Sequence, residues 1–134
     1  MHGSLDISTS GLIAQRTRLN VVAANVANQN TILNENGEYE PFRRRVARLG
    51  AGDPATGSER GVHVMDIELD ESPPLLKYEP GSPFADENGY VGYPNINPVV
   101  EQMNAMEAAR SYEANIAAIE ATKSMTSIAL QLLG

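Results

Sequence analysis

Proline and glycine are absent from two long stretches of the chain, and apolar residues recur within both at helical spacing. The first stretch covers residues 12–36 and the second covers residues 99–133. All eight prolines lie outside these stretches, between Pro41 and Pro98. Because proline and glycine interrupt helices and favour turns, the pattern predicts two helices that flank a middle region of strands and loops.

The first predicted helix carries a narrow apolar seam. Leu5, Leu12, Leu19 and Val26 recur at intervals of seven residues, a spacing typical of helices that pack as coiled coils. An asparagine-rich segment follows, and asparagine favours helix caps and turns. We therefore expect the helix to end near Asn28.

The second predicted helix begins at Asn97-Pro98. Asparagine is a favourable N-cap, and proline is tolerated at the first helical position because its missing N–H would have no partner there. A helix that continues to residue 133 has a length of about 54 Å at the usual rise per residue. Its apolar residues form an imperfect stripe at three-and-four spacing: Val99, Met103, Met106, Ile116, Ile119, Leu130 and Leu133.

The middle region has the pattern of short strands and turns. Val62 and Val64 alternate with other residues, and then Met65, Ile67 and Leu69 alternate in the opposite phase. This change of phase predicts a strand with a bulge or bend near Met65. Turn-forming pairs occur at four places: Asp53-Pro54, Pro73-Pro74, Pro80-Gly81 and Asn88-Gly89.

Together these elements predict an α+β chain in three parts: an N-terminal helical region (1–33), a β-rich insert with loops (34–97) and a long C-terminal helix (98–134). The narrow seams favour a coiled-coil-like pair of the two helices over a large globular core. Asn25, Asn28 and Asn115 lie on or near the seams, where polar residues can fix the register of a coiled coil.

Composition narrows the range of functions. The formal net charge of −7 argues against binding of phosphate or nucleic acid, because such contacts need clustered cations. With two Phe and no Trp, the chain lacks the aromatic surface on which single-stranded bases stack. It also has no Cys, so neither a disulfide nor a thiolate metal site can form.

The candidate chemical groups have simple structural interpretations. His2 and His63 have no second ligand at the spacing of a zinc site, and His63 fits an outward-facing strand position. Asp66, Glu68 and Asp70 alternate with apolar residues, as on the solvated face of a strand, and no calcium-loop spacing is present. We expect no catalytic residues, no metal and no cofactor.

A basic cluster follows Pro41-Phe42, and it consists of Arg43, Arg44, Arg45 and Arg48. The negative charge of the whole chain opposes nucleic-acid binding by this cluster. Two interpretations stay open: contact with an acidic face of a neighbouring subunit, and plain solvation.

The first twenty residues contain no apolar run of signal-peptide length. No stretch approaches the roughly 20 apolar residues of a membrane span. We therefore expect no membrane insertion and, if the protein leaves the cytoplasm, a route without a cleaved hydrophobic leader.

Several long segments resemble bacterial flagellar rod and hook axial proteins. The N-terminal signature of these proteins is similar to residues 10–31, SGLIAQRTRLNVVAANVANQNT, and their C-terminal signature is similar to residues 110–133, RSYEANIAAIEATKSMTSIALQLL. The proximal-rod family of flagellar basal-body rod protein C is more narrowly similar to residues 78–97, YEPGSPFADENGYVGYPNIN. With residues 61–74, GVHVMDIELDESPP, the resemblance covers nearly the whole chain.

This resemblance implies a structural subunit of the proximal rod that transmits torque from rotor to hook. The terminal helices would pack into the inner wall of a hollow axial tube, and export would use the flagellar type III apparatus. Implied partners are the chain itself, other rod proteins, and rotor-ring and rod-base proteins. The residues implied for the assembly interface are Leu12, Leu19, Asn20, Val22, Asn25, Val26, Asn28, Gly89, Tyr90, Pro94, Asn95, Met103, Met106, Arg110, Tyr112, Asn115, Lys123 and Leu130.

Two alternatives differ from the proximal-rod interpretation. One is another axial protein, such as a distal-rod or hook-junction subunit. The other is a small helical-hairpin adaptor or export chaperone, which would stay in the cytoplasm as a stable free dimer.

Overall fold

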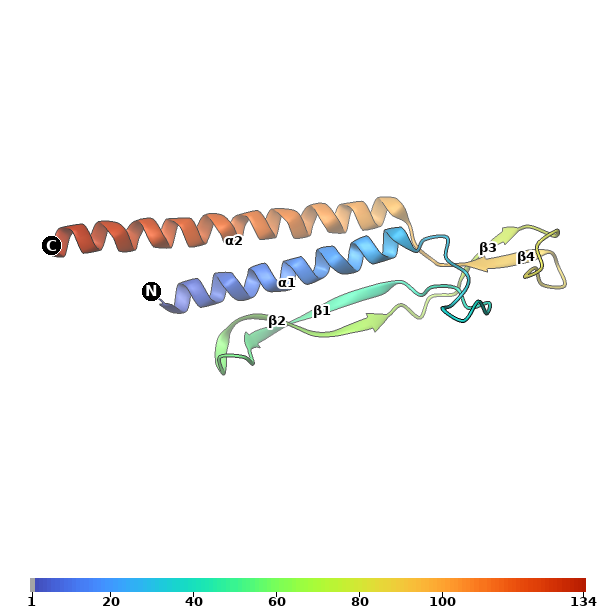
Figure 1. The fold of residues 1–134 in the computed structure, drawn as a ribbon, viewed down its shortest axis with the longest axis horizontal. Helices are drawn as coiled ribbons and strands as arrows, with labels where there is room; N and C mark the ends of the chain where they lie inside the picture. The colour runs from blue at the N-terminus through green and yellow to red at the C-terminus, as the bar shows by residue number, and fades with distance from the viewer. Residues whose placement is uncertain (1) are drawn as a thin grey trace.

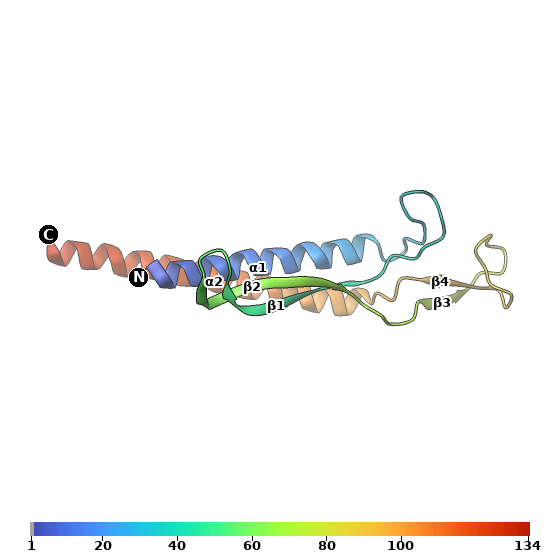
Figure 2. The ribbon, with the colours of Figure 1, turned by 90° about the horizontal axis from the view of Figure 1, so that it is seen from below.

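Two antiparallel helices run side by side along most of the length of the molecule (Figure 1). In the computed structural model, which describes residues 2–134, α1 spans His2–Ala27 and α2 spans Pro98–Leu133. A hairpin of β1 (Arg45–Asp53) and β2 (Ser58–Leu69) packs along α1 and does not contact α2. The α+β architecture predicted from the sequence is thereby confirmed, with α1 as the middle layer (Figures 1 and 2).

The end of α1 is fixed by side chains that cap its last turn. Asn28 donates from Nδ2 to the carbonyl of Ala24 at 2.9 Å, and its Oδ1 accepts from the Thr31 hydroxyl at 3.1 Å. The Ala24 carbonyl also accepts from the Asn28 N–H at 3.0 Å, so the Asn28 side chain adds a second bond to this last turn. The predicted end near Asn28 is confirmed.

The start of α2 follows the predicted cap. Asn97 has extended backbone angles, and its Oδ1 accepts from the Val99 N–H at 2.9 Å. Pro98 occupies the first turn, where it removes no helical hydrogen bond. At the other end the Gly134 N–H donates to the Leu130 carbonyl at 3.0 Å. The helix is continuous over 36 residues.

The antiparallel β1–β2 hairpin contains the predicted bulge. Arg48 pairs with Asp66 and the next residue, Leu49, pairs with Val64, so Met65 is an extra residue on β2. The hairpin is tied to α1 by Ser10, whose Oγ accepts from the Val62 N–H at 3.1 Å and donates to the Ile7 carbonyl at 2.6 Å.

A second hairpin extends from the end of the molecule opposite the two termini (Figure 1). It consists of β3 (Leu75–Tyr78) and β4 (Tyr90–Tyr93), and we call residues 75–93 the arm. Its base is fixed by Tyr39, whose hydroxyl accepts from the Gly92 N–H at 3.0 Å and donates to the Gly92 carbonyl at 2.9 Å.

Most of the residues buried around α1 are small or polar, and Val21 is the exception on α1. On α1 they include Ser8, Ala14, Gln15 and Asn25, and on α2 they are Glu101 and Ala108. The predicted seam residues Leu5, Leu12 and Leu19 are only half-buried, and Val26 is exposed. The helices do pair as predicted, but close approach of small side chains brings them together instead of a stripe of large ones.

The chain therefore has little interior. It exposes 9100 Å² of accessible surface, whereas a globular monomer of the same mass exposes about 6,800 Å². Large apolar side chains contribute to the excess, because many of them point outward on α2 and on both hairpins. An exposed apolar surface of this extent is typical of a subunit that is completed by its neighbours.

Candidate assembly surfaces

The two helices lie close together at Gly11. A methyl group placed on Gly11 would lie 2.6 Å from Asn115 Nδ2 of α2, so only glycine allows this spacing. Two turns further along α1, Arg18 Nη2 lies 3.7 Å from a Glu107 carboxylate oxygen of α2, and Arg18 Nη1 donates to Gln15 at 2.9 Å. In this part of the pair, one steric contact and one exposed ion pair set the register of α1 against α2.

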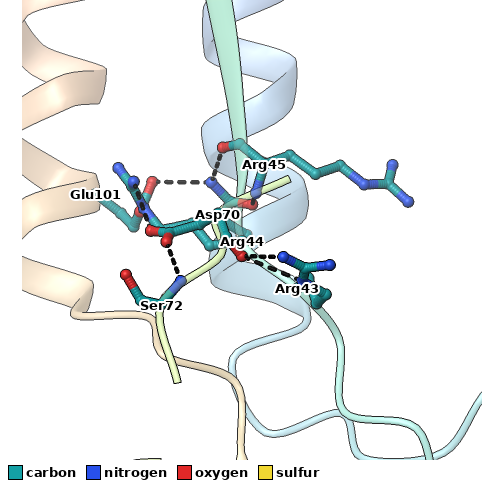
Figure 3. Close-up of polar contacts among 7 residues, drawn as sticks. Arg43, Arg44, Arg45, Asp70, Ser72 and Glu101 are labelled. Atoms are coloured by element: carbon teal, nitrogen blue, oxygen red, sulfur yellow. Dashed lines mark hydrogen bonds and ion pairs between the residues drawn. The ribbon is translucent and has the colours of Figure 1, made fainter. Parts of the chain in front are cut away.

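A buried polar network joins α1, α2 and β1 near the base of the arm (Figure 3). The Asn25 side chain bonds both main-chain polar groups of Arg45, as a paired strand would. Its Oδ1 accepts from the Arg45 N–H and its Nδ2 donates to the Arg45 carbonyl, both at 2.9 Å. The same Nδ2 donates to a Glu101 oxygen at 3.2 Å. Arg44 donates from Nε to the other Glu101 oxygen.

Because the network is buried, it specifies one arrangement of the three elements. Glu101 is completely buried and Asn25 is 1% exposed. A buried carboxylate is tolerated only when cations and hydrogen-bond donors replace its water, and here Arg44 and Asn25 do so. Because its members come from three elements, the network forms only when α1, α2 and β1 adopt this one register.

Asp70 extends the network to the segment that leads into the arm. Its carboxylate lies 3.6 Å from an Arg44 nitrogen, its N–H donates to the Arg44 carbonyl at 2.7 Å, and its carbonyl accepts from the Arg43 guanidinium at 2.8 and 3.1 Å. Hydrogen bonds from Ser72, with a smaller contribution from the Arg44 charge, hold the pKa of Asp70 below its ordinary value. Asp70 is therefore ionised at neutral pH.

The remaining candidate groups are engaged in structural contacts. The expectation that His63 faces outward is wrong: it is half-buried, and its ring Nδ1 lies 2.9 Å from the Gly52 carbonyl oxygen because β1 and β2 are in close contact there. Asp66 and Glu68 are exposed, as predicted, and both contact Arg48. Nothing in residues 3–134 assembles a cluster of three metal-ligating side chains, and the His2 side chain lies outside the described part.

One face of α2 presents large apolar residues to solvent. Val99 is 63% exposed, Met103 65% and Met106 51%. The C-terminal turns of α2 extend beyond the described start of α1 (Figure 1) and are also apolar, with Leu132 83% exposed. The exposed residues that share this face are Val99, Val100, Met103, Met106, Met125, Ile128 and Leu132, and we call them the outer face of α2. Ile116, Leu130 and Leu133 are also exposed but lie on other sides of the helix.

The residues that the sequence implied for assembly fall into two groups. Those that contact other parts of the same chain are at least half-buried: Leu12, Leu19, Val22, Asn25, Asn28, Gly89, Pro94, Asn95, Tyr112 and Asn115. The others are exposed and free to meet a neighbour: Asn20, Val26, Tyr90, Met103, Met106, Arg110, Lys123 and Leu130.

Sequence reasoning missed the most deeply buried polar group. Glu101 lies one turn into α2, where an acidic residue is expected on charge grounds alone. The sequence offered one further hint that a buried carboxylate was needed. It contains an asparagine on the predicted seam, Asn25, and an arginine cluster elsewhere in the chain, and both can bond a carboxylate. The close contact at Gly11 was likewise missed, because nothing local in the sequence shows that Asn115 lies above it.

The comparisons with known proteins agree with this architecture. A family described as "Flagella basal body rod protein" matches residues 5–32, and one described as "Flagellar basal body rod FlgEFG protein C-terminal" matches residues 87–132. The first match covers most of α1, and the second covers most of α2 together with the turn that precedes α2. Within residues 2–134 no helix is both long and apolar enough to span a membrane.

Relatives match across almost their entire length. The flagellar basal-body rod protein FlgC of Salmonella typhimurium (strain LT2) is 43% identical over 121 residues, which cover 90% of this chain and 88% of the relative. FlgC of Escherichia coli O157:H7 is 40% identical with the same coverage. FlgC of Bacillus subtilis (strain 168) is 38% identical over 143 residues, covering 96% and 95%. The chain belongs to the FlgC family of flagellar basal-body rod proteins, which are structural subunits and not enzymes.

Proposed function

We propose that this protein is a subunit of the proximal flagellar rod that assembles through α1 and α2 and transmits torque from the rotor to the hook. The subunit reaches the periplasm through the flagellar type III export apparatus. Its neighbours are further copies, other rod proteins, and the proteins of the rotor ring and rod base.

The observation that carries this proposal is the outer face of α2. Met103 and Met106 leave more than half of their surface in water, and covering that part would stabilise each side chain by roughly 1–2 kcal/mol, a little over half of the value for complete burial. Such residues lie on the outer face near both ends of the helix, which is about 54 Å long, and supply two apolar contact regions. Packing against parallel neighbours in a tube would cover both regions at once.

The buried polar network supports the proposal that the subunit transmits torque. Torque passes through a subunit only if its elements do not slide past one another. The contacts of Glu101, Asn25 and Arg44 fix α1, α2 and β1 in one register. Buried polar groups resist sliding because any shift leaves them without partners.

Electron microscopy of basal bodies from a strain that lacks this gene tests the proposal, with a swimming assay alongside. We expect ring structures without rod, hook or filament, and restoration of all three by the intact gene. Complete flagella and normal swimming in the deletion strain would refute it. A rod that is interrupted further from the rings would instead place the protein in the distal rod.

A further inference from the structure

The arm is a two-stranded sheet, and its β4 edge is closed by groups of the same chain. The Gly92 N–H and carbonyl both bond the Tyr39 hydroxyl, at 3.0 and 2.9 Å. The Tyr90 N–H donates to Asp86 Oδ1 at 2.9 Å, and the Tyr90 carbonyl accepts from the Asp86 N–H at 2.8 Å. The main-chain groups of Gly92 and Tyr90 therefore point away from β3 and are all satisfied.

The β3 edge of the arm is open. Leu76 lies opposite Gly92 and Tyr78 lies opposite Tyr90 in antiparallel register. Because opposite residues in such a pair direct their main-chain groups either toward each other or both away, Leu76 and Tyr78 point away from β4. Within residues 2–134 no other group bonds these main-chain atoms. An unpaired edge of this kind is a template for a further strand.

The side chains of β3 indicate the chemistry of a strand that would fit this edge. Leu76 and Tyr78 alternate onto one face and are 64% and 65% exposed. Lys77 lies on the other face, where its Nζ is 4.4 Å from the centre of the Tyr93 ring. Among residues 3–134 no carboxylate forms an ion pair with Lys77. An antiparallel strand with an acidic residue opposite Lys77, flanked by apolar residues, fits both faces.

Prolines limit the length of the open edge. Pro74 comes immediately before β3, and Pro80 comes two residues after it. Both alternate with Leu76 and Tyr78 along the edge, and neither has an N–H to donate. The edge therefore accepts a short segment and does not template an extended sheet.

A second copy of this chain does not supply the required strand. If β3 paired with β3 of another copy so that Leu76 and Tyr78 of both were bonded, Lys77 would lie directly opposite Lys77, and such like charges are destabilising. β2 contains the suitable sequence Ile67-Glu68-Leu69. However, β2 runs toward the arm and β3 continues from its base to its tip, so copies with the same polarity would place β2 and β3 parallel and not antiparallel (Figure 1).

We propose that an extended segment of a different protein of the basal body adds as an antiparallel strand to the open edge of β3. An acidic residue of this segment faces Lys77, and apolar residues on either side of it pack on Leu76 and Tyr78. Main-chain hydrogen bonds hold the segment, and its alternating side chains select it. This contact is additional to the outer face of α2, and it rests on the proposed function because the partner meets the arm in the rod.

Hydrogen exchange of main-chain amides tests for the added strand. In the free subunit the amides of Leu76 and Tyr78 should exchange faster than that of Lys77, which faces β4. In isolated basal bodies we expect at least tenfold slower exchange at Leu76 and Tyr78. Unchanged exchange at both positions would overturn the proposal. It would leave the rod function intact, since rods would have been present in the isolated basal bodies.

The charge at position 77 tests the acidic residue of the partner in a strain whose own copy of the gene has been deleted. We expect Lys77→Glu to reduce the number of complete rods at least tenfold, whereas Lys77→Arg keeps the cation and should support normal rods. The matched control is Arg60→Glu, which makes the same charge change at an exposed position on β2. Normal rods with Lys77→Glu would overturn the pairing.

Photo-crosslinking from position 78 identifies the occupant of the edge. The crosslinking amino acid p-benzoylphenylalanine replaces Tyr78 in assembled basal bodies, and mass spectrometry maps the residues to which it links. We expect a link to a different protein, within a segment in which apolar residues flank an acidic residue. A link to a second copy of this chain, or to a helical segment of any protein, would overturn the proposal.

Discussion

The two sides of α2 use opposite kinds of residue. The side that meets α1 buries Ala108 and Glu101 and places Asn115 over Gly11. The opposite side exposes Met103, Met106 and further large apolar residues. In a globular protein the large apolar residues would be inside. The inversion shows that the strongest apolar surface of this chain is not used for its own folding.

The two sides of α2 also have different roles: one sets the register of the helices, and the other offers apolar area for contacts with other subunits. Small and polar residues inside the chain specify one register, because Glu101 and Asn25 have partners in only one arrangement. Large apolar residues outside supply area without strict geometry, since the hydrophobic effect is not directional. Substitutions on the inner side should therefore change the stability of the free chain, and substitutions on the outer face should change assembly.

The largest effect on stability is expected for Glu101→Ala. It removes the carboxylate that pairs with Arg44 Nε and with one Asn25 N–H, and removing one partner of a buried ion pair typically costs about 3–5 kcal/mol. The control Glu107→Ala removes an exposed partner of Arg18 from the same helix and should cost at most about 1 kcal/mol. Urea unfolding of the purified chain, followed by circular dichroism, measures both. Equal losses would show that the network contributes no more than a surface ion pair.

A smaller effect is expected for Gly11→Ala. Alanine favours a helix over glycine by about 1 kcal/mol, so Gly3→Ala, which meets open space, should not destabilise the chain. At position 11 the added methyl group collides with Asn115, and such overpacking costs about 1–3 kcal/mol. The melting temperature of Gly11→Ala should fall below that of Gly3→Ala and recover in Gly11→Ala/Asn115→Ala. Identical melting of the two single variants would contradict a close contact.

The smallest effect is expected at Asp70 and depends on pH. Because its pKa lies below the ordinary 3.8, the folded state binds this proton less readily than the unfolded state. The contribution to stability is complete above the unfolded pKa and is lost as the pH falls through the folded pKa. Ser72→Ala removes the hydroxyl bond that lowers this pKa most, so the pKa should rise toward 3.8. An NMR titration of Asp70 that is identical in both proteins would contradict this cause.

Much of the fold was predictable from local chemistry. The Asn97-Pro98 cap, the end of α1 near Asn28 and the bulge at Met65 each depend on a few neighbouring residues. The pairing of the two helices was also predicted, but their contact residues were not. Seven-residue spacing in Leu5, Leu12 and Leu19 marks a surface that is apolar, and it does not say which partner covers that surface.

The candidate assembly residues show the same limit. Asn25 and Asn115 were singled out as register-fixing residues, and the structure gives each a tertiary contact. Glu101 could not be found, because its burial depends on Arg44, 57 positions away in sequence. A lone glutamate in the first turn of a helix is ordinarily exposed, and only the three-dimensional meeting of α1, α2 and β1 reverses that expectation.

Chemical labelling of position 106 tests the role of the outer face most directly. The variant Met106→Cys carries the only thiol in the chain, so its reaction rate with a maleimide reports the exposure of this position alone. We predict rapid labelling of the free subunit and at least tenfold slower labelling in isolated basal bodies, because neighbouring subunits cover the face. Equal rates in the free and assembled states would contradict the claim that the outer face of α2 is an assembly surface.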